Sequence, residues 1–448
     1  MTGATPAPAS RPTSHFRWVI CTLLFAGTTI NYIDRQILAL LKPVLDRELG
    51  WTNEQFGYVN SAFFTVYAAC YALFGWFVDR YGTKIGYATA AFLWSLAAMA
   101  HGAVSSVRGF IFARIALGFG EAGNFPSTVK SMGLWFSRRE RAFASSLFTT
   151  GPNVSAIIAP ALVPWITYHW GWQMSFVVMG AAGLVWLAIW LALYSTPEQS
   201  RFVSAIELAG IRSDAEESSD AAAPIRWRRL LRFRQTWVIL AAKFLTDPIY
   251  WFFLIWLPDF YKKTRGLDLK ASWTLLVAIY AIATVFSVAG GWLTGFLLTR
   301  GWTLTRARKT GLLIFALSVV PVLFAPHAGV ATAIIVMGVA CGAHQAWSAN
   351  IYALNADLFP KQAVAGVAGL SGMVGAVGGI IFPIFAGWLL DHCKASGAGE
   401  SVAYAILFGI CSLAYMAAFA IIHLLAPQFE RIKPCPEVSG QRGLPGSP

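Results

Sequence analysis

The chain has 448 residues, of which 57% are hydrophobic and only 12% are charged, so it is far more apolar than a soluble globular domain. Its formal net charge of +13 would fit a nucleic-acid-binding protein. However, most Lys and Arg residues lie on one side of the apolar segments described below, and this bias explains the charge without nucleic acid. The six cysteines include no CxxC pair, so neither a disulfide framework nor a metal site is expected.

Apolar segments of membrane-crossing length follow one another along the chain. A helix needs about 20 apolar residues to cross a bilayer, and we predict twelve such spans. They lie near residues 17–40, 54–78, 85–104, 107–129, 141–164, 172–194, 236–260, 271–298, 308–325, 329–355, 361–390 and 402–425. The predicted fold class is therefore all-α and integral to the membrane, with 12 transmembrane helices.

One long polar stretch, residues 195–235, divides the spans into two sets of six. The two halves read as a repeat, because aligning them places Phe136 on Phe359, Pro160 on Pro383 and Glu121 on His344. We therefore predict two pseudo-symmetric six-helix bundles. The predicted parts are a cytoplasmic tail (1–16), an N-terminal bundle (17–194), a cytoplasmic linker (195–235), a C-terminal bundle (236–425) and a second cytoplasmic tail (426–448).

The distribution of positive charge predicts the orientation in the membrane. Cytoplasmic loops carry an excess of Lys and Arg, and this rule places both termini in the cytoplasm. The resemblance to bacterial proteins described below implies that the membrane is a bacterial inner membrane. One outer loop breaks the rule, since it carries Lys262, Lys263, Arg265 and Lys270. We interpret this loop as a solvated rim, with a funnel that attracts anions as the alternative.

The turn after the second span carries a recognisable motif. It reads Gly75-Trp-Phe-Val-Asp79-Arg80-Tyr-Gly82-Thr-Lys84, and its glycines permit a tight turn and close helix contact. Together with the twelve spans and the central linker, it resembles the signature loop of the major facilitator superfamily. The resemblance implies the fold of that superfamily and a cytoplasmic gate formed by Asp79, Arg80 and Lys84.

Six charged residues lie inside the predicted spans, where a charge costs roughly 3 kcal/mol or more. They are Asp34, Arg35, Arg114, Glu121, Lys243 and Asp247. Adjacent helical residues point about 100° apart, so Asp34 and Arg35 cannot both face one partner. We expect Asp34 to pair with Arg114 across helices, which leaves Arg35 for a ligand and Glu121 for a proton. The alternative is one static ion-pair cluster that locks the N-terminal bundle.

Two segments narrow the resemblance. Gly118-Phe-Gly-Glu-Ala-Gly-Asn-Phe-Pro126 and Asn31-Tyr-Ile-Asp-Arg35 resemble the anion:cation symporter family, which moves organic anions, often sugar acids, together with protons. The resemblance implies that Arg35 binds the substrate carboxylate, that Asp34 and Glu121 carry protons, that Arg114 pairs with Asp34, and that Tyr32 and Tyr67 contact the sugar.

The second half adds further candidates. Ala343-His344-Gln345-Ala-Trp347 and Lys243-Phe-Leu-Thr-Asp247 resemble the hexuronate transporter branch, and His344, Gln345 and Trp347 are predicted to bind substrate. The alternative for His344 is a buried neutral histidine bonded within its own bundle. Asn153 follows a Thr-Thr-Gly-Pro run where galactonate-type relatives carry Asn-Ser-Gly, and it is a further substrate-binding candidate. For Lys243 and Asp247 we favour a structural ion pair over a coupling role.

These observations predict a secondary active transporter that takes up a hexuronate with protons by alternating access. The alternatives are a proton symporter of another carboxylate (an aldonate, aldarate or aromatic acid), an uncoupled uniporter and, more distantly, a polytopic membrane enzyme. The sequence carries no HExxH, Ser/His/Asp or aspartyl-dyad pattern, so we expect no enzyme. We expect no cofactor besides the coupling protons, no partner besides the bilayer and a small organic anion, and function as a monomer.

Overall fold

The computed structural model describes residues 15–137, 140, 144, 147–148, 150–212, 227–267, 269–359 and 361–432. All regular structure in these residues is helical, which confirms the predicted all-α class. Most of both predicted tails and the acidic run of the linker (214–220) lie outside the described residues.

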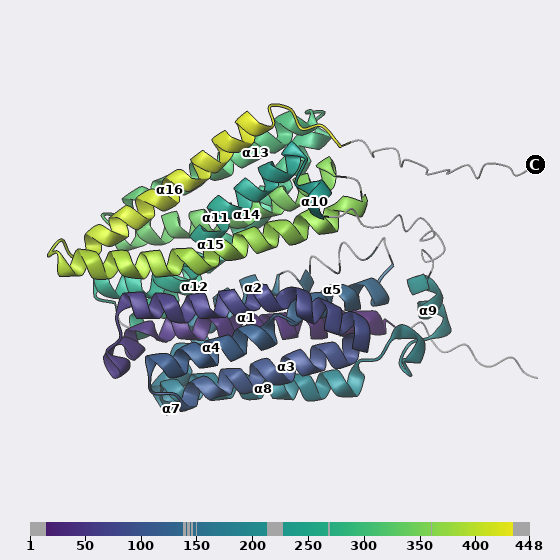
Figure 1. The fold of residues 1–448 in the computed structure, drawn as a ribbon, viewed down its shortest axis with the longest axis horizontal. Helices are drawn as coiled ribbons and strands as arrows, with labels where there is room; N and C mark the ends of the chain where they lie inside the picture. The colour runs from purple at the N-terminus through teal and green to yellow at the C-terminus, as the bar shows by residue number, and fades with distance from the viewer. Residues whose placement is uncertain are drawn as a thin grey trace, which may run out of the picture.

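The helices of the first half pack against one another as one bundle (Figure 1). They are α1 (Phe16–Leu49), α2 (Asn53–Tyr81), α3 (Thr83–Ala100), α4 (Val107–Glu121), α5 (Asn124–Trp135), α7 (Gly151–Trp170) and α8 (Trp172–Leu193). Short 3-10 helices η1 (His101–Ala103) and η2 (Pro197–Gln199) and helix α9 (Ala205–Arg212) follow α3 and α8. The first helical half is thus complete before the linker.

The second half forms the other bundle. It contains α10 (Trp227–Leu230), α11 (Arg234–Arg265), α12 (Leu269–Thr299), α13 (Leu304–Val319) with η4 (Val320–Phe324), α14 (Val330–Leu358), α15 (Lys361–Ala395) and α16 (Glu400–Leu425). The two bundles meet along α2 with α15, α1 with α11, and α7 with α12. These helices form the boundary between the two bundles.

In the described part of the chain, nine helices are long and apolar enough to cross a membrane, so the count of twelve remains a prediction. The predicted span 107–129 differs most, because it is divided into α4 and α5 by a turn at Ala122 and Gly123. Pro126 explains part of this break. It has no backbone N–H and cannot donate to the carbonyl of Ala122, so a continuous helix would lose that hydrogen bond.

The two ends of the described chain lie at the same end of the molecule. The carboxylate of Glu207 on α9 accepts hydrogen bonds from the backbone N–H groups of Phe16 (3.3 Å) and Arg17 (3.0 Å). In the second bundle, Arg234 at the start of α11 donates to the carbonyl of Leu424 at the end of α16. We call this the linker end, and the opposite end, predicted to face outward, the outer end.

Candidate functional site

The centre of the first bundle contains a buried ion pair between α1 and α4. Arg35 Nε donates to Glu121 Oε2 at 2.5 Å, and Arg35 NH2 donates to Asn31 Oδ1 at 3.2 Å, one turn earlier on α1. Glu121 is fully buried and its second oxygen, Oε1, has no hydrogen-bond partner. Among the described residues, the one carboxylate paired with Arg35 is therefore Glu121, a group that can itself accept a proton.

Aromatic rings surround the same guanidinium group. Arg35 Cζ lies 4.6 Å from the ring centres of both Tyr32 and Tyr67 and 5.2 Å from that of Phe63. A ring face attracts a cation and also stacks on the apolar face of a sugar. Tyr32 and Tyr67, two predicted sugar contacts, therefore lie where a ligand held by Arg35 would meet them.

Two glycines of the α4 motif allow this geometry. A Cβ atom at Gly118 would lie 2.6 Å from the carbonyl oxygen of Phe63 on α2, and one at Gly120 would lie 2.5 Å from the backbone nitrogen of Trp94 on α3. Any side chain at either position would push α4 away from its neighbours. Close helix contact through small residues thus brings Glu121 within reach of Arg35.

The predicted pair between Asp34 and Arg114 is wrong in this conformation. Among the residues that the structure describes, both oxygens of the buried Asp34 lack a hydrogen-bond partner, and no ion pair joins Asp34 to Arg114. Arg114 NH2 instead donates to the backbone carbonyl of Arg35 at 3.4 Å, and its guanidinium lies 5.8 Å from the Phe63 ring. Sequence spacing fixed the direction of each side chain around its own helix, but not how neighbouring helices are rotated. The proton-carrying roles of Asp34 and Glu121 remain predictions.

In the second bundle, His344 makes the contacts that its alternative interpretation predicted. His344 Nδ1 lies 2.6 Å from Tyr415 Oη, and its ring stacks on that of Tyr250 at 4.5 Å. Trp347 is fully buried and packs edge-on against Tyr415, so it supports the bundle and presents no surface to a ligand in this conformation. Gln345 is partly buried.

Other candidates from the sequence have simpler surroundings. Asn153 lies in the first turn of α7 and is partly buried. Lys243 and Asp247 form the predicted ion pair within α11, at 2.9 Å, and its structural role stays a prediction. Sequence reasoning missed Asn31 and Gln36. Gln36 donates to Ser155 on α7 at 3.0 Å. The available signal was the spacing along α1, because Asn31 lies one turn before Arg35 and Gln36 lies one turn after Tyr32.

The predicted gate motif lies at the linker end. Gly82 adopts a positive φ of 85° in the turn between α2 and α3, as the motif predicted, whereas Gly75 has no neighbour close enough to require a glycine. Asp79 pairs with Lys130 of α5 at 2.8 Å, and both belong to the first bundle. Arg80 is exposed and Lys84 is partly exposed. A gating role for these residues remains a prediction.

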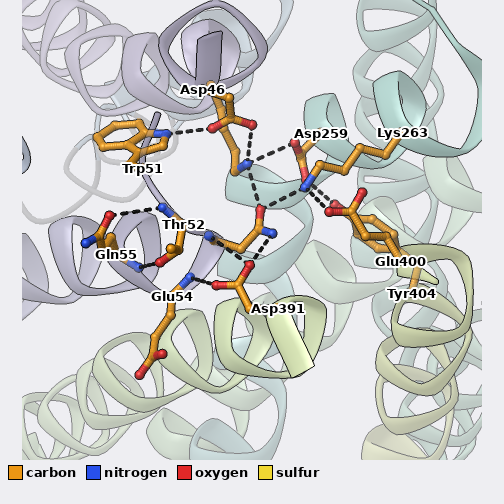
Figure 2. Close-up of polar contacts among 12 residues, drawn as sticks. Asp46, Trp51, Thr52, Glu54, Gln55, Asp259, Lys263, Asp391, Glu400 and Tyr404 are labelled. Carbon is orange, nitrogen blue, oxygen red and sulfur yellow. Dashed lines mark hydrogen bonds and ion pairs between the residues drawn. The ribbon is translucent and has the colours of Figure 1, made fainter. Parts of the chain in front are cut away.

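A polar network that joins the two bundles lies at the outer end (Figure 2). Lys42 Nζ on α1 contacts Asp259 Oδ1 on α11 at 3.0 Å, and Lys263 Nζ on α11 donates to Asn53 Oδ1 on α2 at 2.8 Å. Asn53 also accepts from Lys42 at 3.0 Å. We call Lys42, Asn53, Asp259, Lys263 and Asp391 the outer network.

Asp391 attaches α15 to the start of α2. Its carboxylate accepts from the backbone N–H groups of Asn53 (3.2 Å) and Glu54 (2.8 Å) and from the Asn53 amide (2.7 Å). A carboxylate stabilises the positive end of a helix, and here it comes from the other bundle. A Cβ atom at Gly387 would lie 2.2 Å from the carbonyl of Asn53, so the two helices are in close contact at this point.

The outer network corrects the prediction that the basic outer loop is a solvated rim. Lys263 is paired with Asp259 (3.2 Å) and Glu400 (2.9 Å), and Arg265 donates to the carbonyl groups of Ala325, Pro326 and Ala328. The side chain of Lys270 lies outside the described residues. Sequence reasoning also missed Lys42 and Asp259, because it treated span ends as solvated.

Of the two cavities described here, one lies beside the charged centre but is small, and the other is large but lined by apolar residues. A cavity of about 20 Å³ lies beside Arg35, Asn60, Phe63 and Arg114, which is room for about one water molecule. A larger one, of about 810 Å³, lies between α7 and α12 and is lined by apolar residues such as Trp165 and Trp273. None of the described residues that line the larger cavity carries a charge, so the charged centre remains the candidate site.

Comparison with known proteins agrees with this arrangement. Residues 24–383 match the family model of the Major Facilitator Superfamily. The chain belongs to the major facilitator superfamily. It is 31% identical to the hexuronate transporter of Escherichia coli K12 over 384 residues, which cover 84% of this chain and 88% of that protein. It is 28% identical to the probable galactarate/D-glucarate transporter GarP of the same organism over 417 residues (89% and 92%).

A solved structure shows the same fold. A bacterial homologue of the human lysosomal transporter Spinster, in an inward-facing and occupied conformation, matches with a TM-score of 0.74 over 94% of this chain and 100% of that chain, at 18% identity. The superfamily consists of membrane transporters, so the prediction of a multi-pass transporter and not an enzyme is confirmed.

Proposed function

We propose that this protein is a secondary active transporter that takes up a sugar acid, most simply a hexuronate, together with protons. The single observation that carries the proposal is the buried Arg35–Glu121 pair, whose guanidinium group lies against the rings of Tyr32 and Tyr67. The names of the relatives support a sugar acid as substrate. The predicted bacterial inner membrane and cytoplasmic termini belong to the same proposal.

The pair offers a direct mechanism for coupling. A guanidinium group binds a carboxylate in two-pronged fashion, but in this conformation Glu121 already occupies Arg35. Protonation of Glu121 removes its negative charge and releases Arg35 for the carboxylate of the substrate. Proton and anion therefore bind together, and the net charge of the centre stays the same when both are present.

Alternating access then requires the outer network to form and break. In the structure, Lys42–Asp259 and Lys263–Asn53 connect the bundles at the outer end. Outward opening has to separate these pairs. Each lysine then keeps a partner in its own bundle, because Lys42 also contacts Asp46 (2.7 Å) and Lys263 also contacts Glu400.

Uptake by purified protein in liposomes tests the proposal. A panel of uronates, aldonates, aldarates and aromatic acids is offered with and without an inward proton gradient. We expect accumulation of a uronate only when the gradient is present, and no uptake by an Arg35→Lys variant, because a lysine lacks the planar two-pronged donor. Equal uptake with and without the gradient would support the uncoupled uniporter instead.

A further inference from the structure

The Lys243–Asp247 pair has contacts that a purely structural ion pair does not require. Besides Asp247, Lys243 Nζ donates to Ser348 Oγ at 3.1 Å and lies 4.8 Å from the centre of the Tyr352 ring. Both residues come from α14, where their spacing of four places them on the same face. Three polar groups from two helices therefore converge on one buried ammonium group.

Asp247 leaves one hydrogen-bond acceptor unused. Its Oδ1 atom is buried and has no hydrogen-bond partner, which is costly for a charged group. The carboxylate is also tightly placed, since a Cβ atom at Gly375 on α15 would lie 2.3 Å from Asp247 Oδ2. An acceptor without a donor thus lies beside the donor Lys243 and the hydroxyl group of Ser348.

Helix α11 connects this cluster to the cluster around Arg35. Trp251 lines the cavity beside Arg35 and follows Asp247 by four residues, so both lie on the same face of α11. Gly379 on α15 packs against Trp251 and against Phe64 of α2, and Gly375, one turn earlier, packs against Asp247. The Lys243–Asp247 pair therefore lies one helical turn from the residues that meet the Arg35 cluster across the boundary between the bundles.

We propose that Lys243, Asp247 and Ser348 form the second half of the substrate site and select a hydroxyl group, not a second carboxylate, at the far end of the sugar acid. The inference rests on the proposed function. A sugar hydroxyl can donate to Asp247 Oδ1 and accept from Lys243. A second carboxylate would be repelled by the carboxylate of Asp247. Lys243 would not offset this repulsion, because its charge is already neutralised by Asp247 while that pair is intact.

The relatives do not indicate whether the substrate carries one carboxylate or two, because one relative is named for hexuronates and another for galactarate and D-glucarate. Galacturonate and galactarate serve as probes, with galactonate as their control. Galacturonate is a pyranose with an anomeric hydroxyl at the end remote from its carboxylate, whereas galactarate is an open chain with a second carboxylate there. Galactonate is an open chain like galactarate and carries a terminal hydroxyl in place of the second carboxylate. Measured alongside the other two acids, it separates the charge preference of the Lys243 end of the site from a preference for the ring form.

Binding of the three acids to purified full-length protein in nanodiscs at one fixed pH tests the inference. Wild type is expected to bind galacturonate more tightly. Asp247→Asn leaves the Lys243 charge unopposed and is expected to shift the affinity ratio toward galactarate by about tenfold. Lys243→Met is expected to weaken galacturonate about tenfold without improving galactarate. The double variant, which contains neither charge, controls for the cost of an unpaired buried ion.

Ser348→Ala is a milder variant that keeps both charges, and it is expected to weaken galacturonate a few-fold. If Asp247→Asn does not fold, the double variant and Ser348→Ala still decide the question. Wild type that binds no sugar acid would contradict the proposed function. Wild type that binds galacturonate, with variants that lose stability but keep the wild-type affinity ratio, would overturn this inference alone and leave the pair a structural role.

Discussion

The two ends of the molecule are held in different ways. At the outer end, lysines and carboxylates of one bundle contact the other, as Lys42–Asp259 and Asn53–Asp391 show. At the linker end, within the described residues, the Asp79–Lys130 pair stays inside the first bundle, and no ion pair found there joins the two bundles. The structure is therefore closed by polar contacts at the outer end, and the predicted gate motif does not hold the bundles together in this state.

The ion pairs at the two ends differ in how much they are expected to stabilise this conformation. Lys42 and Asp259 are fully buried, so removing either one leaves the other as a buried charge without its partner, which is costly. Asp79 is well exposed and Lys130 is partly exposed, with side chains 76% and 31% accessible, and exposed pairs of this kind contribute little. We expect variants at the outer end to move the conformational equilibrium and variants at Asp79 to leave it nearly unchanged.

Asp259→Asn should have the largest effect of the network variants. It removes the charge that contacts both Lys42 and Lys263, and we expect a shift toward the outward-open state of about 2 kcal/mol, on the order of thirtyfold. Labelling of an Asn60→Cys reporter from outside with an impermeant maleimide measures this shift. Glu400→Gln is the matched control, because Glu400 pairs with Lys263 within one bundle. Equal labelling of the two variants would show that cross-bundle contact is unimportant.

Asn53→Ala should have a smaller effect in the same direction. The amide is the common acceptor for Lys42 and Lys263 and a donor to Asp391, but no charge is removed. We expect about 1.5 kcal/mol toward the outward-open state, roughly tenfold, in the same labelling assay. A variant that labels like the parent would contradict the network as a latch.

Asp79→Ala should have the smallest effect. Its partner Lys130 is partly exposed, so we expect less than about 0.5 kcal/mol in stability and unchanged labelling of the Asn60→Cys reporter. Its transport rate tests the gating prediction separately. A slower rate with unchanged labelling would indicate that the motif acts in the outward-open state, whereas a large change in labelling would contradict the contrast between the two ends.

Much of the fold could be predicted from sequence because a bilayer imposes a simple length and polarity rule. The sequence did not predict the features that depend on how neighbouring helices pack. The break between α4 and α5 depended on Pro126 and on packing around Gly120. For the site, charge inside apolar spans was enough to select Arg35 and Glu121, but their pairing depended on how α1 and α4 are rotated toward each other.

The outer network was missed for a related reason. Lys42 and Asp259 lie near the ends of predicted spans, where a charge normally reaches water. A pattern was present, because Lys42–Asp46 and Asp259–Lys263 are both spaced by four, occupy matching helices of the two halves and have reversed signs. Such reversed pairs meet when a pseudo-two-fold axis brings the two helices together, and only the structure shows that α1 and α11 do so.

The central claim is that Glu121 is the proton site that competes with substrate for Arg35. Glu121→Gln in liposomes tests it most directly, because the amide mimics the permanently protonated form. We expect this variant to bind sugar acid and to exchange it between two pools at a rate close to wild type, but to lose accumulation driven by a proton gradient. If Glu121→Gln still concentrates substrate when driven only by protons, the coupling site lies elsewhere and the account is contradicted.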